Sequence, residues 1–307
     1  MTSIAAWGKL PGFGDFLRVG SDAAPILAFD AAFSALRLDE ERAALFAASV
    51  PAVAFIHHAD RWWGAVVLSS TDAVGRHAPF VAVAGLRSID PNDEVGVLPL
   101  AFAPFIQRVL GQHAAGWPAD SDGVRSLLLD FATDLTLDDT DSDFVAHLEG
   151  TSQASLANCF GGVEPLTEVL RTVVATATGL VAGCGLRIAP VAGPVQAGFW
   201  LSAVSLIRNR DGIPGPSILH PGNSELAPSI TQLWTAPTAG QLAAALWPSC
   251  SRPALGAQII AVPATEIPEQ VSLPRDLLAE PRAHLRDLLY RLVAQRRTQR
   301  YVRPSPT

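Results

Sequence analysis

Apolar residues recur at helical spacing along much of this chain. Between residues 26 and 46 they return every three or four positions, which predicts one or two helices with a junction near Asp39. The same spacing predicts further helices over residues 100–110, 124–135, 144–148, 164–178 and 241–246.

Runs rich in β-branched and aromatic residues predict strands. The first group covers residues 4–7, 53–57, 62–68 and 80–86, and the short spacer between its second and third members predicts an antiparallel hairpin. A second group covers residues 186–191, 199–207 and 229–234. Turn-forming residues fill positions 208–229, which predicts a long surface connection.

This order of elements predicts an α+β fold. Strands, helices, strands and a final helix indicate a layered body with a largely antiparallel sheet flanked by helices, followed by a C-terminal amphipathic helix. We expect an N-terminal region over residues 1–150, the remainder of the compact α+β body over 151–270, and a basic helical extension over 271–307.

The C-terminal helix is predicted to begin at Pro281. One face carries the apolar side chains, and the arginines lie elsewhere: Leu285, Leu288, Leu289, Leu292 and Val293 against Arg282, Arg286, Arg296 and Arg297. Residues 275–307 hold eight arginines and three acidic residues, a net charge of +5, which leaves −12 on the rest of the chain. Such a helix either packs on the body with a solvated arginine face or contacts a membrane or a partner.

Composition narrows the class of protein. The chain has 307 residues, 49% of them hydrophobic, and a net charge of −7, which argues against a general nucleic-acid binder. Three widely spaced cysteines predict reduced thiols. Neither a basic leader nor a long apolar run is evident, so we expect a cytoplasmic protein without stable membrane insertion. Whether it forms a homo-oligomer stays open.

The segment "WGKLPGFGDFLR", residues 7–18, is the main candidate for chemistry. It sets three glycines and a proline around the only lysine of the chain. A phosphate-binding loop needs G-x-x-x-x-G-K-[ST], but here the lysine precedes Leu10, and Leu17 replaces the third glycine of a dinucleotide fingerprint. The acidic run from Asp139 to Asp143 also fails as a calcium loop, because Phe144 and Gly150 stand where a glycine and a glutamate are needed. We therefore predict a non-enzymatic protein without metal or cofactor. The alternative is an uncharacterised hydrolase or nucleotide-binding enzyme that uses the loop from Gly8 to Asp15.

Two segments together resemble the signature of the TagF family of type VI secretion system-associated proteins. The first, "GKLPGFGDF", matches the family pattern G-K-L-P-x-x-G-D-F. The second, "SSTDAVGRHAPF", residues 69–80, is similar to S-x-D-x-V-G-R-x-[FY]-P-[LF], with Ala78 in place of the aromatic residue. Trp63, Gly64 and Val66 approximate a W-x-G-V strand between the two.

The resemblance implies a function. TagF proteins act in the bacterial cytoplasm as post-translational repressors and engage a forkhead-associated (Fha-type) scaffold that promotes assembly of the secretion apparatus. The residues that carry the resemblance, or lie beside it as candidate interaction residues, are Lys9, Leu10, Pro11, Phe13, Gly14, Asp15, Phe16, Asp72, Gly75, Arg76 and Pro79.

These residues suggest how the two segments meet. Asp15 is expected to accept backbone N–H bonds in its turn or to pair with Arg76, which would bring both segments to one surface. In a structural version, the pair ties the glycine loop to the turn before the third strand. In a functional version, Lys9, Phe13 and Phe16 form part of a partner-binding face.

Overall fold

The computed structural model describes residues 2–22, 24–208, 214–222, 227–234, 236–252, 258–262, 273, 277–278, 280 and 282–300. The strands are β1 Ser3–Gly8, β2 Leu17–Gly20, β3 Ala52–His58, β4 Arg61–Thr71, β5 His77–Arg87, β6 Gly185–Ile188, β7 Ser217–His220, β8 Ser229–Leu233 and β9 Ile259–Val262. The helices are α1 Ile26–Leu36, α2 Glu40–Ala47, α3 Pro91–Glu94, α4 Leu98–Ala101, α5 Ala103–Ala115, α6 Ser121–Phe131, α7 Asp138–Gly150, α8 Gln153–Cys159, α9 Val163–Ala177, α10 Pro194–Arg208, α11 Ala239–Leu246 and α13 Leu285–Arg300.

The strands form one nine-stranded sheet in the order β2-β1-β5-β4-β3-β7-β8-β6-β9. Every neighbouring pair is antiparallel except β6 and β9, which are parallel. The predicted α+β class with a largely antiparallel sheet is confirmed. The pairing of β3 with β7 joins strands from the two predicted body regions into the same sheet, and the division at residue 150 stays a prediction.

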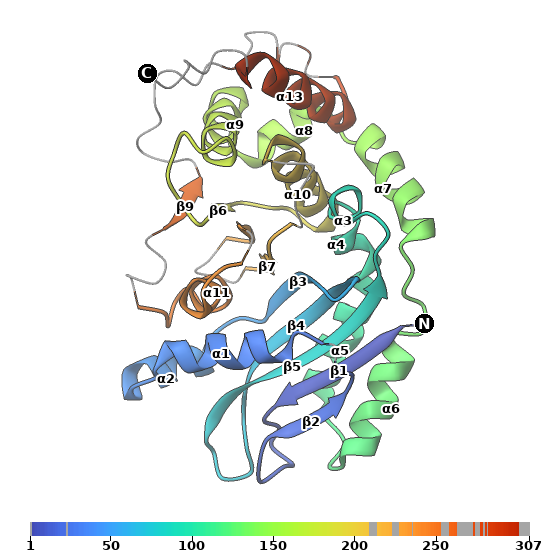
Figure 1. Cartoon of the computed structure of the whole chain (residues 1–307), viewed down its shortest axis with the longest axis vertical. Coiled ribbons are helices and arrows are strands. Elements are labelled where there is room, and N and C mark those ends of the chain that lie inside the picture. The colour runs from blue at the N-terminus through green and yellow to red at the C-terminus, as the bar shows by residue number, and fades with distance from the viewer. Residues whose placement is uncertain are drawn as a thin grey trace.

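Both faces of the sheet are covered, so the fold has three layers (Figure 1). Side chains of a strand point alternately to opposite faces, and the adjacent Trp62 and Trp63 of β4 are each fully buried in a different core. Trp63 lies in the core under α1, α2 and α11. Trp62 lies in the larger core with α4 to α10 and α13.

The N-terminal half follows the sequence pattern closely. The helical stretch at residues 26–46 divides into α1 and α2, and Asp39 caps α2 by accepting a bond from the backbone N–H of Arg42 at 2.9 Å. The predicted hairpin is β3–β4, whose turn residues Ala59 and Asp60 both have positive φ. Such a turn matches the twist of the two strands it connects.

Two predictions for the second half are wrong. Residues 199–207 belong to helix α10. Its buried side chains, among them Phe199, Trp200 and Val204, lie on nearly all sides of the helix. A helix that is apolar all round shows no amphipathic period, so the segment resembled a strand. The predicted surface connection contains the strand β7, which lies in the sheet between β3 and β8.

The basic C-terminal helix packs on the body. Leu285, Leu288 and Leu292 of α13 are buried in the larger core, and the helix contacts α7 and α10. Arg286 pairs with Glu149 of α7 at the surface. This supports the packed arrangement for residues 285–292, whereas the predicted start at Pro281 lies outside the described residues.

A buried histidine lies where β7 meets α11. His220 is 4% exposed, and its Nε2 bonds the carbonyl of Leu246 at 3.1 Å, while Nδ1 has no partner. Burial lowers the pKa of His220 to about 4; the bond to Leu246 opposes this change, and the charge of Arg187 adds to it. The ring is therefore neutral in the folded protein near pH 7.

We expect acid to destabilise the fold through His220. Its contribution is fully present above the unfolded pKa of 6.5 and is lost as pH falls toward 4, because the unfolded chain takes up the proton first. The shift corresponds to roughly 3 kcal/mol in the free energy of unfolding. Urea unfolding between pH 8 and pH 4 should show a weaker pH dependence for His220→Gln than for the parent. The exposed control His58→Gln should follow the parent, and equal slopes for all three proteins would refute the assignment.

Candidate functional site

Two loops lie side by side at one end of the N-terminal half of the sheet. The glycine loop, residues 9–16, connects β1 to β2, and the hairpin loop, residues 72–76, connects β4 to β5. Backbone bonds join them: the N–H of Lys9 donates to the carbonyl of Pro79 at 3.1 Å, and that of Ala73 donates to the carbonyl of Phe13 at 3.0 Å. The two signature segments therefore meet at one surface, as expected.

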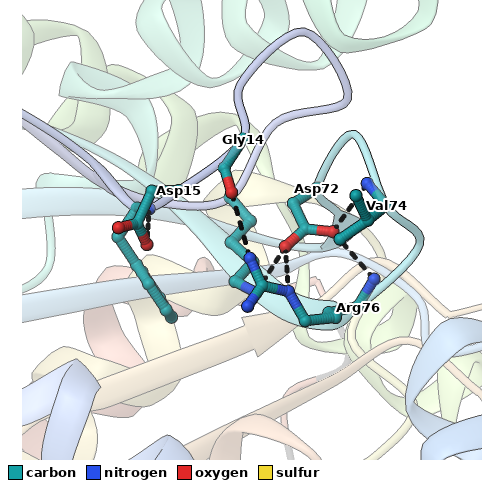
Figure 2. Close-up of polar contacts among 7 residues, drawn as sticks. Gly14, Asp15, Asp72, Val74 and Arg76 are labelled. Atoms are coloured by element: carbon teal, nitrogen blue, oxygen red, sulfur yellow. Dashed lines mark hydrogen bonds and ion pairs between the residues drawn. The ribbon is translucent and has the colours of Figure 1, made fainter.

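The carboxylate of Asp72 holds the loops together (Figure 2). Its Oδ2 accepts from Lys9 Nζ at 2.7 Å and from Arg76 Nε at 2.6 Å. Its Oδ1 accepts the backbone N–H groups of Val74 at 3.0 Å and Arg76 at 2.9 Å, which closes the hairpin loop. One side chain thus shapes its own turn and binds a residue of the other loop.

Two of the three charged side chains that meet here are buried. Lys9 is 5% exposed and Asp72 is 3% exposed, whereas the side chain of Arg76 is 59% exposed. Burial by itself would raise the pKa of the Asp72 carboxyl, but the hydrogen bonds from Lys9, Arg76 and Val74 outweigh it and hold that pKa well below its usual range. Asp72 is therefore ionised whenever the loops are in place.

The predicted pairing of Asp15 with Arg76 is wrong. Asp15 accepts the backbone N–H of Phe16 at 2.8 Å, which was the other expected role of this carboxylate. Arg76 instead donates from Nη2 to the carbonyl of Gly14 at 3.0 Å, so it reaches the glycine loop through the backbone (Figure 2). Asp72 takes the place that the sequence suggested for Asp15, because its four-residue spacing to Arg76 brings both into the same tight turn.

Lys9 does not lie on an exposed face. Its ammonium group is engaged by Asp72, and it lies 5.1 Å from the ring centre of Phe16, which also stacks on Trp7 at 5.4 Å. Phe16 remains 44% exposed, and Phe13 is partly buried. The buried Lys9 thus packs against the ring of Phe16.

The remaining signature residues take structural positions. Leu10 is buried, Pro11 is exposed at the turn, and Gly75 has a φ of +83°, which favours glycine in the hairpin loop. Gly8 has a φ of +126°, and a Cβ there would lie 1.9 Å from the carbonyl oxygen of Pro79. Pro79 therefore needs a residue without a side chain opposite its carbonyl.

The glycine loop differs from a phosphate-binding loop. It leads into the strand β2 and not into a helix, so it has no helix N-terminus to receive a phosphate. Its lysine is buried and already bound to a carboxylate. Among the residues that the structure describes, no group of three or more His, Cys, Asp or Glu side chains could hold a metal ion. The described helices also include none that is long and apolar enough to cross a membrane.

Comparison with known proteins agrees with the resemblance. Residues 5–121 match the family model described as the TagF N-terminal domain, type VI secretion system-associated. Both loops of the site fall inside the match. No curated protein matches the chain significantly.

Among solved structures, the chain is similar to the crystal structure of PA0076 from Pseudomonas aeruginosa PAO1, with 20% sequence identity and a TM-score of 0.34. The match covers 44% of this chain and 63% of that one, so this chain spans less than two thirds of the length of its relative.

Alanine substitutions at Gly8 and Gly14 should have different effects on the free energy of unfolding, because only Gly8 lies where a Cβ would collide with another residue. Gly8→Ala should lower the free energy of unfolding by at least about 2 kcal/mol, because its Cβ would collide with Pro79 in a left-handed backbone conformation. Gly14→Ala should change it by less than about 0.5 kcal/mol, because a Cβ there meets nothing within 4 Å and the carbonyl that binds Arg76 stays. Urea titration measures both, and equal effects would show that the loop conformation differs from this one.

Removing the charge of Asp72 should loosen both loops. Asp72→Asn keeps an oxygen for the two backbone bonds but turns a donor toward Lys9, which stays buried without a counter-charge. We expect Asp72→Asn and Lys9→Met each to lower the melting temperature by about 10 °C. The double variant should lose clearly less than the sum, since no unpaired lysine is left. Additive losses would contradict a direct interaction.

Proposed function

We propose that this chain is a non-enzymatic regulator that represses type VI secretion system assembly by binding the forkhead-associated scaffold, or its complex, in the cytoplasm. The match of residues 5–121 to a type VI secretion system-associated family model supports the assignment to this secretion system. The observation that carries the binding role is the double-loop surface, formed by Asp15, Phe16, Val74 and Arg76, where exposed side chains from two loops are held together by a buried ion pair.

The double-loop surface has the composition of a recognition site. Val74 is 73% exposed and Phe16 is 44% exposed, and both lie next to charged side chains, those of Asp15 and Arg76. Burying one such apolar side chain against a partner contributes roughly 1.5–3 kcal/mol, and flanking charges select the partner. Two anchors of this kind are enough to dominate a small interface.

Rigid presentation strengthens the case. A loop that must become ordered on binding loses part of the interaction energy to conformational entropy. Here the hairpin loop is closed by two bonds to Asp72, and the glycine loop is fixed by Lys9 and by the bond from Arg76 to Gly14. The anchors are therefore preorganised, and the proposed binding needs no cofactor.

The position of Arg76 bears on whether the signature residues hold the two loops together or contact a partner. Its guanidinium binds Asp72 and Gly14, and the side chain as a whole is still 59% exposed. Lys9, in contrast, is buried and paired with Asp72, so we assign it a structural role. We assign partner contact to Asp15, Phe16, Val74 and the exposed side of Arg76.

Val74→Asp tests the surface. Val74 makes its loop bond through the backbone N–H, so the variant should fold like the parent and bind the purified scaffold at least tenfold more weakly, because a carboxylate would enter an apolar contact. Titration calorimetry measures the affinity, and thermal unfolding checks the fold. Ile89→Asp, 89% exposed and outside the surface, is the matched control and should bind like the parent.

The alternatives have distinct outcomes. Equal binding by Val74→Asp and the parent would remove the double-loop surface from the interface while leaving the partner intact. No binding by well-folded parent protein, with or without the other components of the complex, would overturn the proposed partner.

A further inference from the structure

The strand β2 forms one edge of the sheet, directly after the glycine loop. It pairs with β1 on one side, and the described residues supply no strand on its other side (Figure 1). α6 contacts both β1 and β2, and its buried side chains lie in the larger core together with Leu17. This helix therefore covers one face of β2 and leaves the edge of the strand open.

The pairing with β1 fixes the direction of the main-chain groups of β2. The N–H of Ser21 donates to the carbonyl of Ile4 at 2.8 Å, and alternate residues of a strand direct their N–H and C=O groups to opposite sides. Val19 therefore faces β1, whereas Arg18 and Gly20 face outward. Gly20 is exposed and has no side chain, so the surface that it offers to solvent is main chain.

The outward groups of β2 are unpaired and held in place. Within the described part of the chain, no hydrogen bond reaches the outward N–H and C=O groups of Arg18 or the N–H of Gly20. Leu17 is buried and Val19 packs against the same core, so the strand keeps its position without a neighbour at its edge. Fixed, unpaired main-chain groups at a sheet edge are a template for an added strand.

The side chains beside this edge indicate which segment fits it. Arg18 lies opposite Trp7 in the β1–β2 pairing, and the ring of Phe16 stacks on Trp7, so Phe16 and Arg18 share one face. Arg18 is exposed and is the only charged residue of β2, and no acidic side chain among the described residues pairs with it. A strand with an acidic residue opposite Arg18 brings a residue two positions away beside Phe16.

We propose that β2 binds an extended segment of a partner protein as an added antiparallel strand. An acidic residue of the segment lies opposite Arg18, and an apolar residue two positions further along lies against Phe16. In antiparallel pairing, one residue of the segment bonds both outward groups of Arg18. Phe16 also belongs to the double-loop surface, so the added strand extends that surface along the sheet edge. The inference rests on the proposed function for the identity of the partner alone.

A second copy of this chain fits the edge less well than such a segment. A short antiparallel pairing of two β2 strands places two Arg18 side chains near each other on the same face, and like charges across a strand pair are destabilising. A single arginine on the edge thus disfavours pairing of the protein with itself and favours a strand of opposite charge.

Amide resonances of the isotope-labelled full chain test the proposal. The probe is the peptide acetyl-Thr-Thr-Thr-Glu-Thr-Leu-Thr-amide, and the matched probe has lysine in place of glutamate. The glutamate peptide should shift the amide signals of Arg18 and Gly20 saturably, with half-saturation in the millimolar range that a few main-chain bonds provide. The lysine peptide should bind at least about fivefold more weakly, because its charge repels Arg18.

Two substitutions of Arg18 separate the main chain from the charge. Proline removes an N–H that points to solvent, so Arg18→Pro should fold like the parent and lose binding of both peptides. Arg18→Ala keeps the N–H and should bind the two peptides equally. Arg87→Ala, at an exposed arginine that ends β5, is the matched control and should respond like the parent.

A modified peptide keeps the test independent of how the variants fold. Methylation of the glutamate nitrogen removes the donor to the carbonyl of Arg18 and should abolish binding to the parent. Equal binding of the methylated peptide, or no saturable shift of the Arg18 and Gly20 signals with the glutamate peptide, would overturn the proposal. Shifts of these signals that depend on protein concentration alone would assign the edge to a second copy and would also overturn it.

The same experiment separates this inference from the proposed function. Peptide binding at β2 by a protein that does not bind the scaffold would support the edge site and reject the partner. Scaffold binding without peptide binding would support the partner and reject the edge site.

Discussion

The buried carboxylate of Asp72 is the constraint on which the candidate site depends. A buried charge is tolerated only where opposite charges and hydrogen-bond donors surround it, and this one needs Lys9 from one loop and Arg76 and Val74 from the other. Neither loop can move away without leaving a charge unpaired. The conformation of both loops, and with it the exposure of Phe16 and Val74, follows from that requirement.

The sheet supplies the rigid base for this pairing. β4 and β5 are eleven residues long each and buried on both faces through most of their length, so their connecting loop starts from fixed ends. β1 pairs with β5 and places Gly8 opposite Phe80, which sets the distance between Lys9 and the hairpin loop. The two cores that fix the strands thus also fix the separation of the two signature segments.

The sequence predicted the parts of this arrangement that depend on local pattern. Periodicity identified α1, α2 and the β3–β4 hairpin, and the two signature segments identified the loops. It failed for α10, whose side chains are buried all round, and for β7, a short strand among turn formers that only its neighbours in the sheet stabilise. Nor did the sequence show which carboxylate pairs with Arg76. The choice between Asp15 and Asp72 depends on how the two loops fold against each other, and Lys9 of the glycine loop is 63 residues from Asp72 along the chain.

The burial of Lys9 changes what the signature means physically. A lysine among glycines suggests contact with a phosphate or a partner, but here its ammonium group is paired with Asp72 inside the protein. Gly8 is likewise required by the carbonyl of Pro79 and not by a ligand. Much of the signature therefore encodes the loop architecture, and under the proposed function the contact with a partner is made by the exposed residues that this architecture presents. If the double-loop surface binds a partner as we propose, substitutions at Phe16 and Val74 can change the partner while the buried ion pair stays the same.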